Sequence, residues 1–182
     1  MAKKDYKEVV ILPEKVSMIQ EGNFFIVKGP KGEVKKALVN PKIKTSLQNN
    51  TFTLEVKKGS KREKTSLYTI NAHVRNMIKG VTQGHVYKLK ICSGHFPMTV
   101  TATAKEVSVK NFLGEKIPRV MAIPEGVKVK VDNITITVES VNLDLAGQTA
   151  ASIEKLTRIT SRDLRIFQDG VYITEKDGKP VI

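Results

Sequence analysis

The sequence predicts an α+β protein of two tandem duplicated modules, each a mostly antiparallel or mixed β-sheet with one α-helix packed on a face. One short phrase occurs twice, as Leu12-Pro13-Glu14-Lys15-Val16 and as Ile123-Pro124-Glu125-Gly126-Val127. Each copy leads into alternating apolar residues, and each half then carries one stretch of helical period. Strands grouped before a helix, without an alternating strand-helix-strand rhythm, favour the α+β class.

The first module has clear strand and helix signals. Strands are predicted at 9–12 and 16–19, around Phe24 and Ile26, at 34–39 and at 52–56. Gly29-Pro30-Lys31-Gly32 is predicted as a turn, because Pro fixes one φ and Gly accepts a positive φ. From Leu67 the apolar period becomes that of a helix lying on a sheet, and its stripe consists of Ile70, Val74, Met77, Ile78 and Val81.

The second module repeats this plan after a strand predicted at 86–92. Two alternating runs joined at Asp132-Asn133 predict a hairpin. A helix is expected at 148–159, burying Ala150, Ile153 and Leu156 on one side. The expected domains are therefore a basic first module at 1–82, a second module at 83–176 and a flexible C-terminal tail at 177–182.

The charge balance favours a polyanionic partner. Lys and Arg number 31 against 18 Asp and Glu, a net charge of +13. Up to Thr82 there are 17 basic and 7 acidic residues, against 14 and 11 beyond it. Such a balance suits nucleic acid or an acidic membrane surface, although an excess of lysine that only keeps the protein soluble is the simpler alternative.

The remaining composition indicates a soluble cytosolic protein. Cys92 is the only cysteine, so no disulfide within the chain is possible. No apolar run approaches the roughly 20 residues of a membrane helix, and residues 1–7 are polar, unlike a signal peptide. With 5% aromatic residues and no Trp, nucleic-acid binding is expected to rest on Lys and Arg contacts to phosphate rather than on base stacking.

Several basic groups are candidate contacts to nucleic-acid phosphates. The run at 57–64 holds five cations around Gly59 and Ser60, and it is interpreted as a flexible loop that either stays solvated or clamps phosphates. Lys88 and Lys90 share one strand face. The cations of this run and of the later clusters are Lys57, Lys58, Lys61, Arg62 and Lys64, then Lys116 and Arg119 beside Pro118, then Arg158, Arg162 and Arg165 after the second helix.

Catalytic and metal chemistry have weak signals. His85, Cys92 and His95 are the only group that suggests a metal, but opposite strand faces and a missing fourth ligand favour ordinary strand and loop roles. Glu14 and Glu125 follow prolines in the repeated phrase, so turn geometry explains them. No catalytic residue, metal or cofactor is therefore assigned. An uncharacterised basic enzyme and a peripheral membrane or protein-adaptor module remain the alternatives.

Five separate motifs carry a family resemblance. They are Asn76-Met77-Ile78-Lys79-Gly80-Val81-Thr82-Gln83-Gly84 with the following Tyr87-Lys88-Leu89, Gly94-His95-Phe96-Pro97-Met98, Asn111-Phe112-Leu113-Gly114-Glu115-Lys116, Gly147-Gln148-Thr149-Ala150-Ala151 and Phe167-Gln168-Asp169-Gly170-Val171-Tyr172. In this order, over residues 9–176, they resemble the L-six family of large-subunit ribosomal proteins, in its archaeal and eukaryotic branch and most closely the archaeal members.

The resemblance implies a non-catalytic constituent of the large ribosomal subunit in the cytoplasm. It implies binding to large-subunit rRNA near the factor-binding centre, at the base of the lateral stalk, beside neighbouring ribosomal proteins and without a membrane or small-molecule substrate. In that family the second module makes the main RNA contacts. Carried over by position, this favours His95, Lys116, Arg119, Arg158, Arg162 and Arg165, whereas the charge count favours the first module, so the division of contacts stays open.

Overall fold

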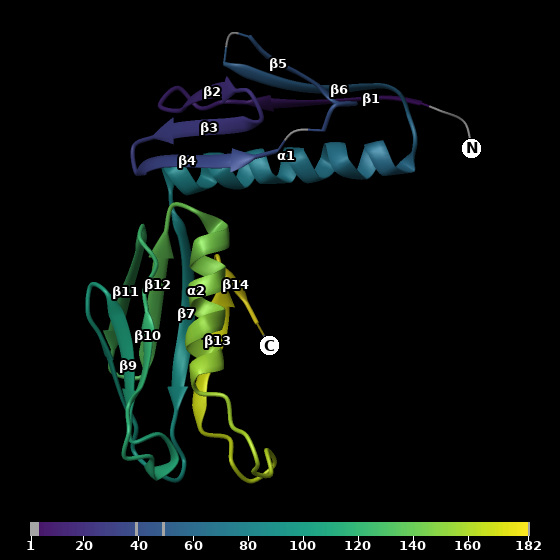
Figure 1. Ribbon diagram of the computed structural model, residues 1–182. Helices are drawn as coiled ribbons and strands as arrows, with labels where there is room; N and C mark the ends of the chain where they lie inside the picture. The colour runs from purple at the N-terminus through teal and green to yellow at the C-terminus, as the bar shows by residue number, and fades with distance from the viewer. Residues whose placement is uncertain (1–3, 39, 49, 182) are drawn as a thin grey trace. The chain divides into compact units, whose positions relative to one another are not determined.

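The structure divides into two compact units, with the boundary between Gly84 and His85 (Figure 1). It is a computed structural model that describes residues 4–38, 40–48 and 50–181. The division lies two residues beyond the boundary expected after residue 82. Each unit has its own sheets and its own long helix, as a duplicated α+β chain requires.

The first unit packs one helix against two three-stranded antiparallel sheets, with strand orders β1-β6-β5 and β2-β3-β4. Its elements are β1 (Lys4–Ile11), β2 (Ser17–Glu21), β3 (Phe24–Gly29), β4 (Gly32–Ala37), β5 (Lys44–Gln48), β6 (Thr51–Gly59) and α1 (Lys61–Thr82). The helix contacts strands of both sheets. Phe25 and Phe52 meet edge to face, with ring centroids 5.4 Å apart, and join the two sheets in the core.

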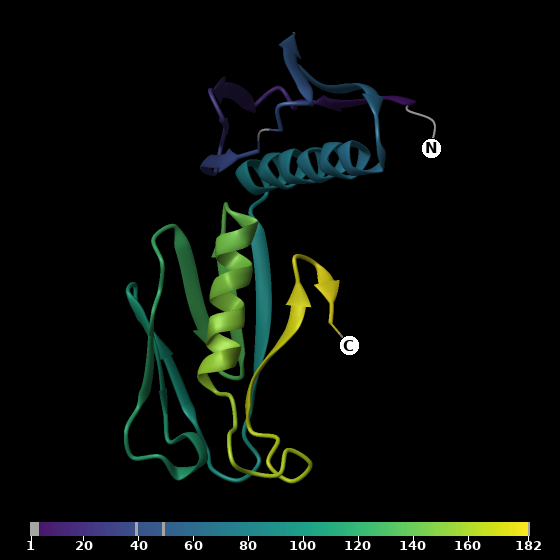
Figure 2. The same ribbon diagram turned by 45° about the vertical axis from the view of Figure 1, so that its right-hand side comes forward.

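The second unit places its helix on one face of a five-stranded sheet, an arrangement that both ribbon views show (Figure 2). Its strand orders are β11-β12-β7-β13-β14 and β10-β9-β8. The elements are β7 (His85–Cys92), β8 (Thr99–Ala102), β9 (Glu106–Lys110), the 3-10 turn η1 (Phe112–Gly114), β10 (Arg119–Ala122), β11 (Val127–Asp132), β12 (Thr135–Ser140), α2 (Leu143–Leu156), β13 (Gly170–Lys176) and β14 (Lys179–Pro180). Leu89, Ile136 and Ile153 are fully buried between helix and sheet.

The element order confirms the duplication. A first strand, a three-stranded meander, a hairpin that pairs with the first strand, and a helix occur in the same order in both units. The repeated phrase, however, does not mark equivalent positions. Pro13 follows the first strand of its unit, whereas Pro124 precedes the hairpin of the other. The equivalence of Glu14 and Glu125 is therefore wrong, because a Pro-Glu turn suits any connection between strands.

The first helix starts earlier than its apolar stripe predicts. Ser60 precedes the first turn in an extended conformation, and its N–H donates to Glu63 Oε2 over 2.9 Å, which is half of a capping box. Gly84 ends the helix with φ +79°, a left-handed conformation that costs little only for glycine. The expectation of a flexible loop at 57–64 is consequently wrong, since this run ends β6 and begins α1.

The second helix also begins before its expected start at residue 148. Asn142 caps it, because its Oδ1 accepts the N–H of Asp144 over 3.0 Å. Among the described residues, neither long helix has the length and apolar composition needed to cross a lipid bilayer.

Two strand assignments differ from the sequence-based expectation. Residues 177–181 are not a flexible tail, because β14 pairs with β13 and the N–H of Val181 donates to Thr174 O over 2.8 Å. Strand β5 was not predicted, because its burial shows no clear alternation. The turn at 29–32 is confirmed by the pairing of Gly29 with Gly32. Of the strand expected at 34–39, residue 39 lies outside the described residues.

Candidate nucleic-acid interface

Three loops of the second unit come together at one end of its sheets (Figure 1). They span residues 93–98, 111–118 and 157–169, and we call them the loop cluster. Asn111 Nδ2 donates to Pro97 O over 3.0 Å, and a Cβ at Gly114 would lie 3.7 Å from the Phe96 ring. The first and third loops meet through His95 and Asp169. Six of the predicted RNA-binding residues lie in or beside this cluster, namely His95, Lys116, Arg119, Arg158, Arg162 and Arg165.

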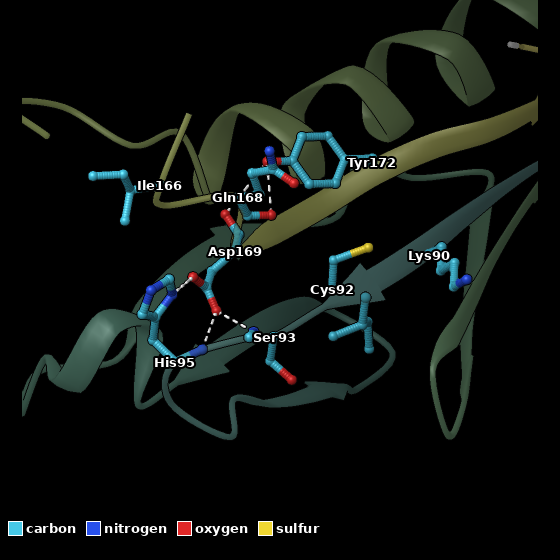
Figure 3. Close-up of a pocket in the computed structure, with 10 residues that line it drawn as sticks. Lys90, Cys92, Ser93, His95, Ile166, Gln168, Asp169 and Tyr172 are labelled. Atoms are coloured by element: carbon cyan, nitrogen blue, oxygen red, sulfur yellow. Dashed lines mark hydrogen bonds and ion pairs between the residues drawn. The ribbon is translucent and has the colours of Figure 1, made fainter. Parts of the chain in front are cut away.

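The buried carboxylate of Asp169 holds the first loop (Figure 3). It accepts the N–H groups of Gly94 and His95 over 2.5 and 2.9 Å, and it lies 2.6 Å from His95 Nδ1. Desolvation raises the pKa of Asp169, but the bonds from His95 and Gly94 outweigh it and hold the pKa below its ordinary value. An ionised carboxylate only accepts, so Nδ1 carries the proton and Nε2 is the nitrogen directed away from Asp169.

Aromatic and cationic groups stack at the surface of the cluster. The His95 and Phe167 rings are stacked, with centroids 4.6 Å apart and planes 27° apart. The Arg162 guanidinium carbon lies 4.8 Å from the Phe167 centroid. Such stacking restricts the guanidinium while leaving its N–H donors at the ring edge, where they can reach an anion.

Arg119 is engaged mostly inside the protein. Its Nε and Nη2 donate to Glu115 over 2.8 and 2.6 Å, and its Nη1 donates to the carbonyls of Leu156 and Arg158 over 2.7 and 3.3 Å. The guanidinium also lies 4.4 Å from the Phe112 centroid. Because Arg119 satisfies the carbonyl of Leu156 at the end of α2 and that of Arg158 in the third loop, the structure gives it a positioning role between the second and third loops.

The other cations of the loop cluster are more exposed to solvent than Arg119. Arg165 pairs with Asp163 over 2.8 Å, yet its side chain is 90% exposed. Lys116, Arg158 and Arg162 form no ion pair with the described residues, and all three are exposed. Since Glu115, Asp163 and Asp169 are each bonded to a neighbouring cation or to His95, the acids of the cluster leave these side chains available to an anionic partner.

Exposed apolar side chains accompany these charges. All three loops contribute, with Phe96 in the first, Ile117 in the second, and Leu164 and Ile166 in the third. Ile117 is 80% exposed and Leu164 is 64% exposed. Large apolar groups gathered with cations at one end of a unit are typical of a surface that a partner covers.

Lys88 and Lys90 belong to β7 and not to the loop cluster, and they lie on the face of the five-stranded sheet opposite α2. Lys88 Nζ lies 2.9 Å from Glu175 Oε2. Lys90 is exposed and pairs in register with Tyr172 of β13, next to the loop cluster. The shared strand face predicted for the two lysines is confirmed, but only Lys90 borders the cluster.

The cations of the first unit lie at the junction of β6 and α1. Lys57 and Lys58 belong to the strand, and Lys61, Arg62 and Lys64 belong to the first turn of the helix. A groove of about 430 Å³ beside them is also lined by Lys42 and Lys44. These two lysines were missed because they are distant in sequence, and only the pairing of β5 with β6 brings them close.

Some of these charges are balanced within the protein. The Lys42 ammonium, 2.8 Å from Glu63, together with bonds from Ser60, lowers the pKa of Glu63 to about 2. The Lys64 ammonium lies 5.4 Å from the Tyr6 centroid and 5.9 Å from that of Tyr68. Lys42 and Lys64 are thus partly held by the protein.

The three residues considered for a metal are not assembled. His85 is buried at the start of β7 beside Asp177, with Nδ1 3.2 Å from Oδ1, whereas Cys92 ends the same strand. In a strand this separation is about 20 Å. Within the described residues, no three His, Cys, Asp or Glu side chains gather as metal ligands.

The fold and the charge balance define a class, that of basic proteins built on a duplicated α+β scaffold. A model of the family described as Ribosomal protein L6 matches residues 12–84 and 96–170. The chain is 42% identical over 173 residues to the large ribosomal subunit protein uL6 of Methanococcus vannielii, which covers 95% of each chain. It is also 42% identical over 172 residues to the protein of the same name from Desulfurococcus amylolyticus, over 93% of this chain and 94% of that one.

The chain therefore belongs to the ribosomal protein L6 family. Its members are structural ribosomal proteins and not enzymes, and both relatives named above are archaeal. The resemblance inferred from the five sequence motifs is confirmed, and the alternative of an uncharacterised enzyme is wrong.

Proposed function

We propose that this protein is a structural constituent of the large ribosomal subunit in the cytoplasm and binds large-subunit rRNA near the factor-binding centre, at the base of the lateral stalk. Family membership supports the ribosomal role. The observation that carries RNA binding is the loop cluster, where Lys116, Arg158 and Arg162 are exposed and the acids are bonded internally.

RNA recognition by this surface rests mainly on phosphate. Arg162 and Arg165 present planar forks of donors, which match phosphate oxygens better than a lysine ammonium does. Neutralising phosphates releases counterions, so affinity falls steeply as salt rises. The exposed Phe96, Ile117 and Leu164 are buried on assembly, against RNA sugars or a neighbouring ribosomal protein.

The first unit supplies a second cationic surface at the junction of β6 and α1. Lys44 and Lys57, which line its groove, are exposed, as are Lys61 and Arg62 on the first helical turn. We assign this surface to weaker phosphate contacts, because it holds lysine ammonium groups rather than a set of positioned guanidinium forks. The loop cluster makes the closer fit.

A salt titration with purified large-subunit rRNA tests this assignment. Replacing Arg162 and Arg165 together with Ala should weaken binding and flatten the slope of log affinity against log salt by about 1.5, since each lost phosphate contact removes roughly 0.7 to 0.9. The matched control removes two exposed cations outside the cluster, by Lys105→Ala with Lys179→Ala. An unchanged slope in the first variant, or an equal change in the control, would place the interface elsewhere.

Footprinting of the same complex tests the location. Protection of nucleotides near the factor-binding centre is expected, and its loss in the arginine variant should coincide with the loss of affinity. Protection confined to a distant part of the subunit would contradict the location. Purified large subunits that lack the protein would contradict the function itself.

A further inference from the structure

A groove of about 750 Å³ opens beside the loop cluster, between the end of β7 and the start of β13 (Figure 3). Its walls include Lys90, Ser93, His95, Gln168 and Tyr172. The strand register explains the hollow, because Gly170 pairs with Cys92 and brings no side chain of its own to this face. The Tyr172 ring, the His95 imidazole, the Gln168 amide and the Lys90 ammonium therefore border the same groove.

The two rings of the groove are held by the protein. The Tyr172 hydroxyl lies 3.2 Å from Gln168 O and 3.4 Å from Asp169 O, and a Cβ at Gly170 would lie only 3.3 Å from the ring. The ring thus rests on the backbone while the side chain stays 42% exposed. Asp169 fixes the His95 ring in the same way. Pre-positioned rings lose little conformational freedom when a ligand stacks on them.

The charge of the groove suits an anion beside a ring. Lys90 is exposed and lies directly across the strand pair from Tyr172, where opposed residues are about 5 Å apart. The one acid on the walls, Asp169, is already bonded to His95 and Gly94. A ligand with a flat unsaturated ring and a nearby negative charge matches this arrangement.

We propose that this groove holds one unpaired nucleotide of the large-subunit rRNA, with its base stacked on Tyr172 and its phosphate at Lys90. This inference rests on the proposed function. A paired base has both faces covered by its neighbours in the helix, so only an unpaired nucleotide can offer a face to a side-chain ring. The site adds base stacking to an interface for which the sequence indicated phosphate contacts alone.

Chemical probing of rRNA bound to the full-length protein tests the site. The wild-type protein should protect one unpaired nucleotide in addition to its phosphate contacts. Tyr172→Leu should lose that protection and weaken binding about tenfold, the loss typical of one stacked base. Tyr172→Phe keeps the aromatic ring, so it should keep most of the nucleotide protection and most of the binding affinity. Tyr68→Leu, at an exposed tyrosine of the first unit, is the matched control and should change neither.

A second variant tests the site independently in case Tyr172→Leu does not fold. Lys90 is exposed, so Lys90→Ala should leave the fold intact and flatten the salt slope by about 0.7, the value for one phosphate of a single strand. If wild-type protein binds rRNA while Tyr172→Leu and Lys90→Ala bind with unchanged affinity and protection, the inference is wrong although the proposed function stands. If the groove variants instead lose only a neighbouring ribosomal protein, the occupant is a protein and the inference is also wrong. If the wild-type protein binds no rRNA, both fail.

Discussion

Replacing Arg119 with Ala should destabilise the second unit and leave the first unit almost unchanged. The guanidinium makes two bonds to Glu115, two to the carbonyls of Leu156 and Arg158, and a cation–π contact with Phe112. Its side chain is 27% exposed, so solvent replaces part of each interaction in the variant. The two units have separate cores, which makes separate unfolding transitions the natural expectation.

The expected loss of stability follows from the contacts that Arg119 makes with the rest of the protein. Carbonyl groups that lose a charged donor cost about 1.5 to 3 kcal/mol when they stay dry, and less where water reaches them. The partly exposed pair with Glu115 adds at most about 1 kcal/mol. A loss of about 2 kcal/mol is therefore expected, which corresponds to a Tm lower by roughly 8 to 16 °C for a unit of this size.

Calorimetry of the full chain measures this shift, and hydrogen exchange at the last turn of α2 locates it. Arg119→Lys keeps the charge but not the fork, so it should fall between wild type and Arg119→Ala. Arg165→Ala is the matched control, since that guanidinium is 90% exposed and should hardly affect Tm. If Arg119→Ala were no more destabilising than Arg165→Ala, the positioning role of Arg119 would be refuted.

Three further changes test other contacts. Folding lowers the pKa of Asp169. The stability that this carboxylate contributes is therefore fully present above its unfolded pKa and is lost as the pH falls through its folded pKa. Asp169→Asn should remove this pH dependence of stability and release the His95 ring, which an NMR titration of His95 measures. Glu63→Ala should destabilise the first unit alone, measured by urea unfolding, because it removes the carboxylate that accepts the Ser60 N–H, and an equal loss in both units would contradict the capping role. Gly29→Ala places a Cβ 2.7 Å from Val81 Cγ2 and should cost about 1 to 3 kcal/mol, whereas an unchanged Tm would show that the helix can shift.

Local signals in the sequence were sufficient for much of the fold. The alternation of Phe52, Leu54 and Val56 and the helical stripe at Val74 and Met77 depend only on which face of an element is buried. Helix starts were harder, because the apolar stripe of α1 begins near residue 67 while the caps lie earlier, at Ser60 and Asn142. The repeated Pro-Glu phrase pointed to a real duplication from positions that are not equivalent.

The candidate interface was predictable only in its residue types. The sequence marked the arginines at 158, 162 and 165 as a basic cluster from their spacing alone. It did not separate Arg119, whose donors are used inside the protein, from Arg162, which stacks on Phe167 and stays exposed. That difference depends on which carbonyls and rings lie nearby.

The sequence by itself determined the family, the α+β class and the surplus of positive charge, because motifs, periodicity and composition are properties of the chain before it folds. Only the tertiary structure decided that His95 meets Asp169, that Lys42 and Lys44 join the cations of the first unit, and that Tyr172 lies opposite Lys90. These residues are brought together by strand register and loop packing. Such contacts link positions far apart in sequence, and no local pattern specifies them.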